Sequence, residues 1–359
     1  MGVTDKIAEI EKEIEKTQKH KGTEHHLGLL KAKIAKLREQ LETIGKSGGK
    51  KKAFEVKKSG NATVVFIGFP SVGKSTLLSA LTNKKSKAAA YSFTTTTVIP
   101  GMMAYKGAQI QLLDLPGIIS GASKGLGRGR EVLAVARNAD LILLITDVKQ
   151  TNTEKLRQEL KEINIRLDEK PPNIVIEPKD KGGVEVNYSI KPTKLKTETV
   201  RGVLGEYSIF NATVNIRQDA SIDELIDVIM NNRKYVPSLT AVNKIDLAKP
   251  RELKKLPKNV MLVSAEKKEG INELKEAIFN KLELIRIYTK SKFEKTDLNA
   301  PLLMRSDATI KNLCDLIHRD LRSLFKFAEV WGPSAKHPGQ KVGLNHKLKD
   351  GDVIQIHKI

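Results

Sequence analysis

Apolar residues recur every three or four positions through the first 44 residues, and this period predicts two amphipathic helices. Ile7, Ile10 and Ile14 follow it in the first helix, and Leu30, Ile34, Leu37, Leu41 and Ile44 follow it in the second. A glycine turn within KHKGTEHH joins the two helices. We therefore expect a helical hairpin over residues 1–48, which either contacts a partner or RNA or packs only on its own protein.

From Thr63 the pattern changes to short apolar runs that alternate with helical spacing. The basic, glycine-rich stretch GKSGGKKK separates this region from the hairpin. The predicted strands are TVVFIGF, AQIQLLDLP and DLILLITDV, and the predicted helices are KSTLLSALT and GREVLAVARNA. This alternation predicts a parallel sheet covered by helices. We assign residues 49–150 and 233–290 to this domain.

Two further regions do not follow this alternation. About ninety residues separate Asp147 from Asn243, which is too long for a loop plus one helix. A hairpin pattern, PPNIVIEPKDKGGVEVNYSI, and two helical stretches predict an α+β insert over residues 151–232. After residue 290 the pattern is a strand, a helix and short strands, with Asp350-Gly351 as a turn before VIQI. Residues 291–359 therefore resemble a β-grasp domain.

Composition narrows the classes of protein. No apolar run approaches the roughly 18 residues of a membrane span, and the charged start MGVTDKIAEIEKE is unlike a signal peptide. We expect a cytoplasmic monomer with no membrane partner. The single cysteine, Cys314, excludes an internal disulfide and a multi-cysteine zinc site.

The net charge of +21 calls for a polyanionic partner beyond one nucleotide, and RNA is the natural candidate. Aromatic residues make up only 4% of the chain. This argues against a base-stacking platform and for contact with the phosphate backbone of a structured RNA. A lysine-rich surface that serves only thermal or colloidal stability is the alternative.

The segment GFPSVGKS matches GxxxxGK[ST] between a predicted strand and a predicted helix, which predicts a loop that holds nucleotide phosphates. Its amides and the helix N-terminus face the phosphates, and Lys74 neutralises their β and γ charge. Ser75 offers a hydroxyl to Mg²⁺. The nucleotide-binding residues expected here are Gly68, Phe69, Pro70, Ser71, Val72, Gly73, Lys74, Ser75 and Thr76.

Two further segments supply the groups that would bind the metal ion and the γ-phosphate. Asp114 ends a predicted strand in DLPG and is placed to hold a magnesium-bound water, while the Gly117 amide can sense the γ-phosphate. The threonine run in FTTTT supplies the last metal ligand, for which we choose Thr95; Thr94, Thr96 and Thr97 stay open. The expected metal ligands are Ser75, Thr95 and Asp114.

Asn243-Lys244-Ile245-Asp246 identifies the base. A carboxylate accepts two hydrogen bonds from guanine N1–H and its exocyclic amine, which adenine cannot supply. Asn243 is suited to the N7 side of the purine, and the stem of Lys244 can cover the base. Ser264 and Ala265 fit the remaining backbone contact to the guanine oxygen. The predicted ligand is GTP or GDP.

The groups that would catalyse hydrolysis differ from those of Ras-like enzymes. Ile118 and Ile119 follow DLPG, so the glutamine that orients water in Ras-like enzymes is missing and turnover is expected to be slow. Lys74, Thr95 and Gly117 are the catalytic candidates. Arg128 or Arg130 reaches a phosphate or faces RNA, and a monovalent cation such as K⁺ is a further candidate for the missing charge.

GFPSVGKST, the FTT segment, DLPGIISGASKGLGRGRE and NKID together resemble the Obg branch of translation-factor-related GTPases. KTQKHKGTEHHLGLLKAKIAKLREQL, RLDEKPPNIVIEPKDKGGVEVNYSI and VWGPSAKHPGQKVGLNHKLKDGDVIQI narrow the resemblance to the developmentally regulated GTP-binding proteins, with a C-terminal TGS domain. Relatives usually read FTTLTT, whereas Thr96 stands at the leucine position here. Ser71 stands where potassium-dependent GTPases tend to carry asparagine.

The resemblance implies an α/β fold: a P-loop GTPase core with a parallel sheet, an N-terminal helical element, an α/β insert and a TGS module directed to RNA or the ribosome. It also implies a stabilising regulatory partner protein and a role around translation. We expect a slow GTP-hydrolysing switch. The alternatives are a ribosome- or RNA-binding scaffold with a structural nucleotide, and an ATPase, against which Asp246 argues.

Overall fold

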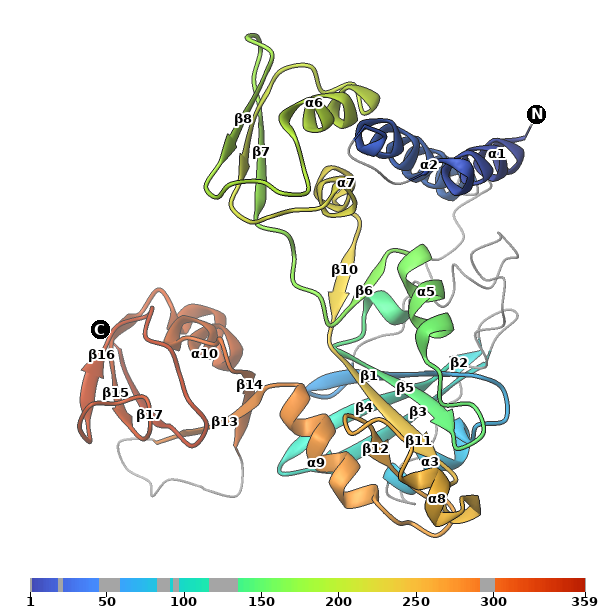
Figure 1. The fold of residues 1–359 in the computed structure, drawn as a ribbon. Helices are drawn as coiled ribbons and strands as arrows, with labels where there is room; N and C mark the ends of the chain where they lie inside the picture. Colours follow the sequence, from blue (N-terminus) through green and yellow to red (C-terminus); the bar gives the residue numbers. More distant parts are fainter. Residues whose placement is uncertain are drawn as a thin grey trace. The chain divides into compact units, whose positions relative to one another are not determined.

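The computed structural model describes residues 2–18, 22–44, 59–82, 91–92, 97–115, 135–290 and 301–358. The chain divides into two compact units (Figure 1). One unit comprises residues 1–53 and 169–235, and the other comprises residues 54–168 and 236–359. Thr95 and Gly117 lie outside the described residues. No helix among the described residues is long and apolar enough to span a bilayer.

The larger unit is built on a seven-stranded sheet with the order β12-β11-β5-β1-β4-β3-β2. Its strands are β1 (Ala62–Gly68), β2 (Tyr91–Ser92), β3 (Thr97–Tyr105), β4 (Ala108–Asp114), β5 (Leu141–Asp147), β11 (Ser238–Asn243) and β12 (Met261–Leu262). Four pairings are parallel, and β3 runs antiparallel to both β4 and β2. This mostly parallel sheet confirms the predicted α/β fold.

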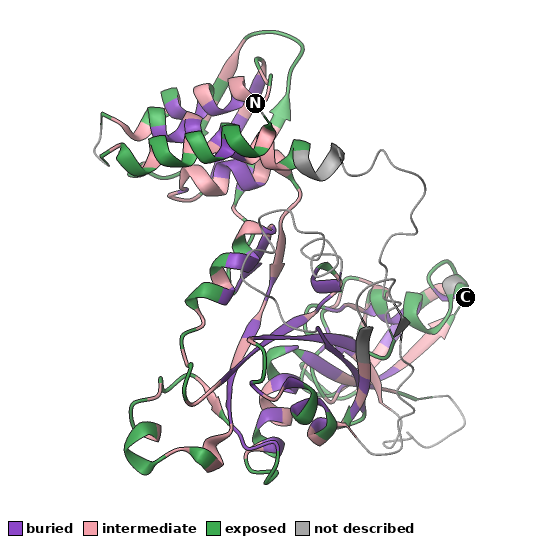
Figure 2. Cartoon of the chain, turned by 90° about the vertical axis from the view of Figure 1, so that its right-hand side faces the viewer, coloured by how far each residue is buried: buried purple, intermediate pink, exposed green. Residues whose placement is uncertain are grey.

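Helices cover both faces of this sheet, which is why its central strands are almost wholly apolar. Every residue of β1 is buried, and Figure 2 shows that buried residues dominate the strands of the sheet. Val64 and Phe66 belong to the core that includes α3 (Lys74–Leu81) and α9 (Ile271–Lys281). Val65 and Ile67 belong to a second core, which includes α5 (Glu154–Glu162) and β6 (Ile165–Leu167). The short η2 (Ile245–Leu247) and α8 (Pro250–Leu253) follow β11.

The C-terminal part of the larger unit is a five-stranded sheet with the order β14-β13-β17-β15-β16. Its elements are β13 (Leu284–Thr289), β14 (Leu302–Arg305), α10 (Ile310–Ile317), η3 (Arg319–Leu321), β15 (Phe325–Trp331), β16 (Gln340–Val342) and β17 (Val353–Lys358). Helix α10 contributes Ile310, Leu313 and Cys314 to the core on one face. Burial raises the pKa of the Cys314 thiol, as expected of a packing residue. This arrangement agrees with the expected β-grasp.

The smaller unit combines the N-terminal hairpin with a three-stranded sheet of order β7-β9-β8. Its elements are α1 (Val3–Lys16), α2 (Glu24–Ile44), β7 (Ile174–Pro178), β8 (Val184–Tyr188), α6 (Thr197–Glu206), β9 (Ala212–Ile216) and α7 (Ile222–Met230). The chain then returns to the larger unit through β10 (Lys234–Val236). The sequence pattern placed residues 151–168 in the insert and the hairpin in a domain of its own. In the structure, α5 and β6 lie in the larger unit, and the hairpin shares a core with residues 169–235.

Helix α2 packs on α6 and α7 through both apolar and polar contacts. Ala32 is fully buried in the core of the smaller unit. The Tyr207 hydroxyl donates to the Ala32 carbonyl at 3.2 Å, and burial raises the pKa of Tyr207 to about 12. Lys31 pairs with Asp223 at 2.9 Å, and Lys36 donates to the Glu206 carbonyl. This face of the hairpin, including some of its basic residues, therefore packs on its own protein.

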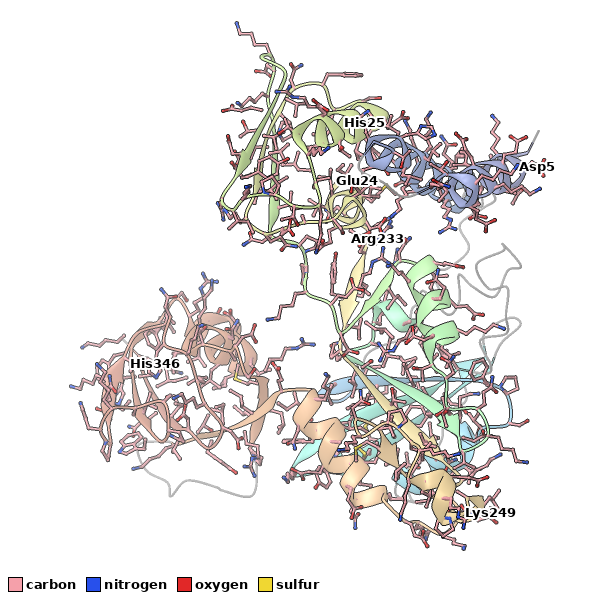
Figure 3. All side chains as sticks on the ribbon, in the orientation of Figure 1. Asp5, Glu24, His25, Arg233, Lys249 and His346 are labelled. Carbon is pink, nitrogen blue, oxygen red and sulfur yellow. The ribbon has the colours of Figure 1, made fainter. Side chains whose placement is uncertain are left out.

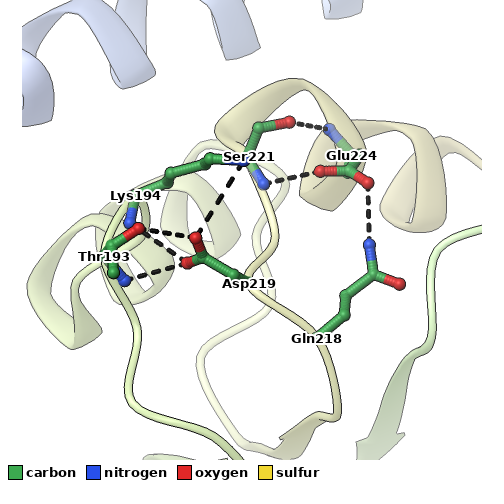
Figure 4. A network of polar contacts seen from close by, with 6 residues as sticks. All are labelled: Thr193, Lys194, Gln218, Asp219, Ser221 and Glu224. Atoms are coloured by element: carbon green, nitrogen blue, oxygen red, sulfur yellow. Dashed lines mark hydrogen bonds and ion pairs between the residues drawn. The ribbon is translucent and has the colours of Figure 1, made fainter.

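A polar network fixes the loop before α6 against the start of α7 (Figure 4). The amide of Thr193 donates to Asp219 at 2.8 Å and its hydroxyl donates at 2.5 Å, and these bonds lower the pKa of the Asp219 carboxyl. Ser221 caps α7 by a reciprocal pair of hydrogen bonds with Glu224. Gln218 also donates to Glu224, at 2.7 Å. The start of α7 is thus specified by side chains rather than by apolar packing alone.

Replacing Gly202 by Val is expected to loosen the contact between α2 and α6. A Cβ atom at Gly202 would lie 2.6 Å from the His25 ring, which α2 carries (Figure 3). His25 is exposed and its ring can turn aside, so the crowding falls mainly on Leu29, whose Cδ2 would lie 3.2 Å from that Cβ atom. Overpacking of this kind costs about 1 kcal/mol, so amide hydrogens of α2 and α6 should exchange faster with solvent. Gly205→Val is the matched control on the same helix, because nothing lies within 4 Å of a Cβ atom there. Equal exchange in both variants would contradict the prediction.

Candidate nucleotide-binding site

The candidate site lies at the carboxyl ends of the parallel strands. β1 ends at Gly68, β4 at Asp114 and β11 at Asn243, and the pairing registers bring these ends to one edge of the sheet. Ligands of open α/β sheets bind at this edge. The loop after β1 leads directly into α3, so its amides and the helix N-terminus face the same space.

Two glycines allow the loop to take its path. A Cβ atom at Gly68 would lie 2.2 Å from the carbonyl oxygen of Ile145 on the neighbouring strand. Gly73 has φ of +86°, and a Cβ atom there would lie 2.5 Å from Asn243 Nδ2. Ser71 also has a positive φ, of 63°. Val72 is 1% exposed and anchors the loop in the core below it.

Lys74 is buried beneath this loop, with 8% of its surface exposed. Its ammonium donates to the carbonyls of Gly68 at 3.1 Å and Phe69 at 2.9 Å. Burial lowers the pKa of Lys74, and the nearby Asp114 carboxylate opposes this by favouring the charged form. The loop therefore holds a cation on a flexible stem, within reach of any anion that the loop amides bind.

Ser75 and Asp114 form the polar pair next to this cation. The Ser75 hydroxyl donates to Asp114 Oδ2 at 2.6 Å. Asp114 is 4% exposed, and its other oxygen, Oδ1, is buried with no hydrogen-bond partner among the described residues. Buried carboxylate oxygens are rarely left unpaired. A hydroxyl and a carboxylate are the oxygen ligands that Mg²⁺ prefers, directly or through water.

Asn243 and Lys244 tie the phosphate loop to the second half of the site. Asn243 Nδ2 donates to the Val72 carbonyl at 3.0 Å, and its Oδ1 accepts from the Ala265 amide at 3.0 Å. Lys244 has φ of 62°, and its ammonium donates to the Ser71 carbonyl at 2.6 Å. The side chain of Asn243 thus serves as a bridge between two loops.

Asp246 and Ser264 form the far end of the site. The Ser264 hydroxyl donates to Asp246 Oδ1 at 2.6 Å, and this bond lowers the pKa of the Asp246 carboxyl. Ser264 is fully buried, whereas Asp246 is only half-buried, so the carboxylate is held in place and still accessible. A fixed carboxylate of this kind can accept hydrogen bonds from two neighbouring N–H groups of a planar ligand.

The structure thus brings the predicted residues together in two groups. Lys74, Ser75 and Asp114 meet beside the loop Gly68–Thr76, and the loops that carry Asn243, Lys244, Asp246, Ser264 and Ala265 meet beyond it. Pro70 and Thr76 are exposed on the loop, and Phe69 is partly buried. Of the other threonine candidates, Thr97 begins β3, whereas Thr94 and Thr96, together with Arg128 and Arg130, lie outside the described residues.

Sequence reasoning missed Asp147, which ends β5 at the same edge of the sheet. Its Oδ2 lies 3.9 Å from the Lys244 ammonium, and its Oδ1 accepts from the amides of Lys149 and Gln150 at 3.0 Å. The signal was present, because a carboxylate follows the buried strand LILLIT. Without the pairing register, nothing connected it to Lys244, whose ammonium it faces.

Family models match the chain from residue 63 to residue 358 with almost no gap. Residues 63–178 match a 50S ribosome-binding GTPase, residues 181–284 match the C-terminal region of MMR_HSR1 domain, and residues 285–358 match a TGS domain. The first match includes the phosphate loop and Asp114, and the second includes Asn243, Asp246 and Ser264. The two groups of site residues therefore lie in regions that GTPases of this family share.

Curated relatives match from end to end. An uncharacterized GTP-binding protein of Methanocaldococcus jannaschii is 50% identical over 99% of this chain and 93% of its own length. Developmentally-regulated GTP-binding protein 2 of Homo sapiens is 48% identical over the full length of both chains. Developmentally-regulated GTP-binding protein 1 of Xenopus laevis is 48% identical over 99% of both chains. The chain belongs to the family of developmentally-regulated GTP-binding proteins.

Proposed function

We propose that this protein hydrolyses GTP slowly to GDP and phosphate, and that the bound nucleotide switches its association with ribosomes. The observation that carries the proposal is the meeting of a buried Lys74, the Ser75–Asp114 pair and the fixed Asp246 at one sheet edge. The family match to a 50S ribosome-binding GTPase supports the ribosome as partner.

Mg²⁺ fits the donors at the phosphate end. The unpaired Asp114 Oδ1 and the Ser75 hydroxyl are the residues that would hold it, with Thr95 as the third ligand. When bound, the metal neutralises charge on the β- and γ-phosphate oxygens. Lys74 exchanges its two loop carbonyls for phosphate oxygens, and the Gly117 amide donates to the γ-phosphate. Ordering of Thr95 and Gly117 by GTP is the switch.

The base end selects guanine. Asp246 accepts from N1–H and the exocyclic amine, Ser264 keeps the carboxylate oriented, and Lys244 covers the base. The Ser264–Ala265 segment contributes the contact to the guanine oxygen, and Asn243 holds the two loops in register. An adenine ring would leave Asp246 unpaired, which is the reason for GTP rather than ATP.

The remaining parts of the proposal rest on the sequence and the family resemblance. Ile118 and Ile119 stand in place of the water-orienting glutamine, so GTP hydrolysis is slow. A ribosome or K⁺ supplies the catalytic group that the chain lacks. Ser71, where potassium-dependent GTPases carry asparagine, makes the ribosome the stronger candidate. We place the protein in the cytoplasm as a monomer that a regulatory partner protein stabilises.

Steady-state GTP hydrolysis with and without purified ribosomes, in potassium and in sodium buffers, tests the proposal. Ribosomes are expected to raise the slow rate about tenfold or more, and Lys74→Ala protein is expected to lack the effect. The competing function is an RNA- or ribosome-binding scaffold with a structural nucleotide. A flat rate, together with equal ribosome binding in GDP and in GTP, would establish that function instead.

Replacing Ser264 by Ala is expected to raise the pH at which guanine nucleotide binding is lost on acidification. The Ser264 hydroxyl lowers the pKa of Asp246, so the carboxylate stays charged, and GDP stays bound, until the pH falls through that lowered value. Without the hydroxyl the pKa rises and affinity is lost earlier on acidification. The measurement is the Kd of a fluorescent GDP against pH. Ser79→Ala, which removes a hydroxyl bonded to a helix carbonyl, should leave the profile unchanged.

A further inference from the structure

Strand β14 contributes side chains to two different hydrophobic cores. Met304 is buried in the core that α10 covers, and Leu302 packs against the same core. Leu303 packs instead against the core of the GTPase domain, to which Val64 and Phe66 of β1 belong. Successive side chains of a strand point to opposite faces. One face of β14 therefore belongs to the C-terminal domain, and the other is turned to the GTPase domain.

The face of β14 that carries Leu303 also makes an ion pair with the GTPase domain. Arg305 is two residues further along the strand and so points to the same side as Leu303. Its guanidinium lies 2.5 Å from Asp140 Oδ1, immediately before β5. The carboxylate of Asp140 is only 11% exposed, and its Oδ2 accepts from the Thr63 amide of β1 at 2.9 Å. β14 is thus anchored at the amino ends of β1 and β5.

Pro301, just before β14, covers the turn of the β3–β4 hairpin. Lys106 and Gly107 form this turn, with positive φ angles of 46° and 82°, as a tight two-residue hairpin turn requires. A Cβ atom at Gly107 would lie 3.0 Å from Pro301 Cγ and 3.6 Å from its Cδ. On the other side, the Tyr105 ring packs edge-on against Phe279 of α9, with centroids 6.0 Å apart. The tip of the hairpin is therefore held between the C-terminal domain and α9.

The opposite end of this hairpin lies at the phosphate end of the candidate site. The two strands pair in continuous register from the tip to Ile99 and Asp114. In the sequence, Thr95 precedes β3 and Gly117 follows β4, and these are the residues that GTP is proposed above to order. β4 is buried along almost its whole length, and close-packed interiors transmit displacement. Support at the tip therefore restricts the strand ends beside the nucleotide.

We propose that β14 braces the β3–β4 hairpin, and that Pro301 and Arg305 are positioning residues for GTP binding. GTP must order two segments that GDP leaves free. A hairpin that is already held at its tip has less freedom to lose, so the brace favours GTP over GDP. By reciprocity, GTP strengthens the contact of β14 with the GTPase domain. The inference rests on the proposed switch, because it assumes that GTP orders the segments next to β3 and β4.

The test is the affinity of the full-length protein for GDP and for a non-hydrolysable GTP analogue, measured by displacement of a fluorescent nucleotide. Pro301→Ala removes the two ring carbons that cover the hairpin turn, and Arg305→Ala removes the ion pair. Each variant is expected to bind the GTP analogue about fivefold more weakly and GDP unchanged. Pro338→Ala and Arg322→Ala are the matched controls, because both residues are exposed in the same domain. Neither control is expected to change either affinity.

Hydrogen exchange provides the reciprocal measurement. Amides of β14 are expected to exchange more slowly with the GTP analogue bound than with GDP bound, and Pro301→Ala is expected to remove the difference. An unchanged ratio of the two affinities in both variants would overturn the inference. So would an equal loss of both affinities, since β14 would then only stabilise the fold. Equal exchange of β14 in the two nucleotide states of the original protein would also refute it.

Ribosome-stimulated GTP hydrolysis, measured on the same proteins, separates this inference from the proposed function. If ribosomes stimulate hydrolysis but the variants keep the original ratio of affinities, the switch is supported and the brace is refuted. If the ratio falls in the variants but ribosomes do not affect hydrolysis, the brace is supported and the ribosome is not the partner of the switch.

Discussion

Replacing Asp246 by Asn is expected to weaken GTP binding about 10³-fold, because two hydrogen bonds to a charged acceptor are lost. Each is worth about 1.5–3 kcal/mol, and every 1.4 kcal/mol is tenfold in affinity. Asp246 is well placed for this role, since Ser264 fixes one of its oxygens at 2.6 Å and the side chain is still accessible. The measurement is the Kd of GTP and of GDP by displacement of a fluorescent analogue.

The same variant is expected to gain affinity for xanthosine triphosphate. Xanthine carries an oxygen where guanine carries the exocyclic amine, and the Asn amide can donate to it. Asp147→Asn is the matched control: it lies at the same sheet edge, contacts Lys244 and makes no contact with the base in the proposed arrangement. A variant at Asp246 that binds GTP as tightly as the original protein would refute the assignment of this carboxylate.

The meeting of the candidate residues at one sheet edge could be predicted from the sequence because its signals are local. Gly68, Gly73 and Lys74 fall within one short motif between a strand and a helix, and their geometry depends mainly on that turn. The fold class followed for a similar reason, since each buried strand of a parallel sheet is a continuous apolar run. The bridging role of Asn243 was not predictable, because it depends on how three loops meet at the sheet edge.

The contacts between distant segments could not be predicted from one sequence. The apolar stripe of α2 indicates that it packs on something, but nothing in its period says that Ala32 meets α6. Asp223 and Lys31 are each ordinary surface charges in the sequence and become a pair only in the fold. Tyr288, Phe327 and Trp331 are the clearest case, because strand register alone brings them to one face of the C-terminal sheet.

Replacing Lys74 by Ala is expected to lower the rate of GTP hydrolysis about 10²–10³-fold, the usual effect of removing one charged donor from a transition state. The ammonium is the cation buried beneath the phosphate loop, and Asp114 favours its charged form against the effect of burial. GTP affinity is expected to fall more than GDP affinity, because the γ-phosphate loses a partner that GDP never had. Single-turnover hydrolysis and the two Kd values are the measurements.

Two control variants distinguish the loss of the Lys74 charge from an effect on packing. Lys106→Ala removes a lysine that pairs with Glu276 away from the phosphate loop, and its hydrolysis rate is expected to be unchanged. Lys74→Arg keeps the charge but replaces a narrow ammonium stem by a planar guanidinium, which the space beneath Gly68 and Phe69 does not suit. It is expected to be as slow as the Ala variant. A Lys74→Ala protein that hydrolyses GTP at the original rate would show that the loop binds phosphate without using this cation.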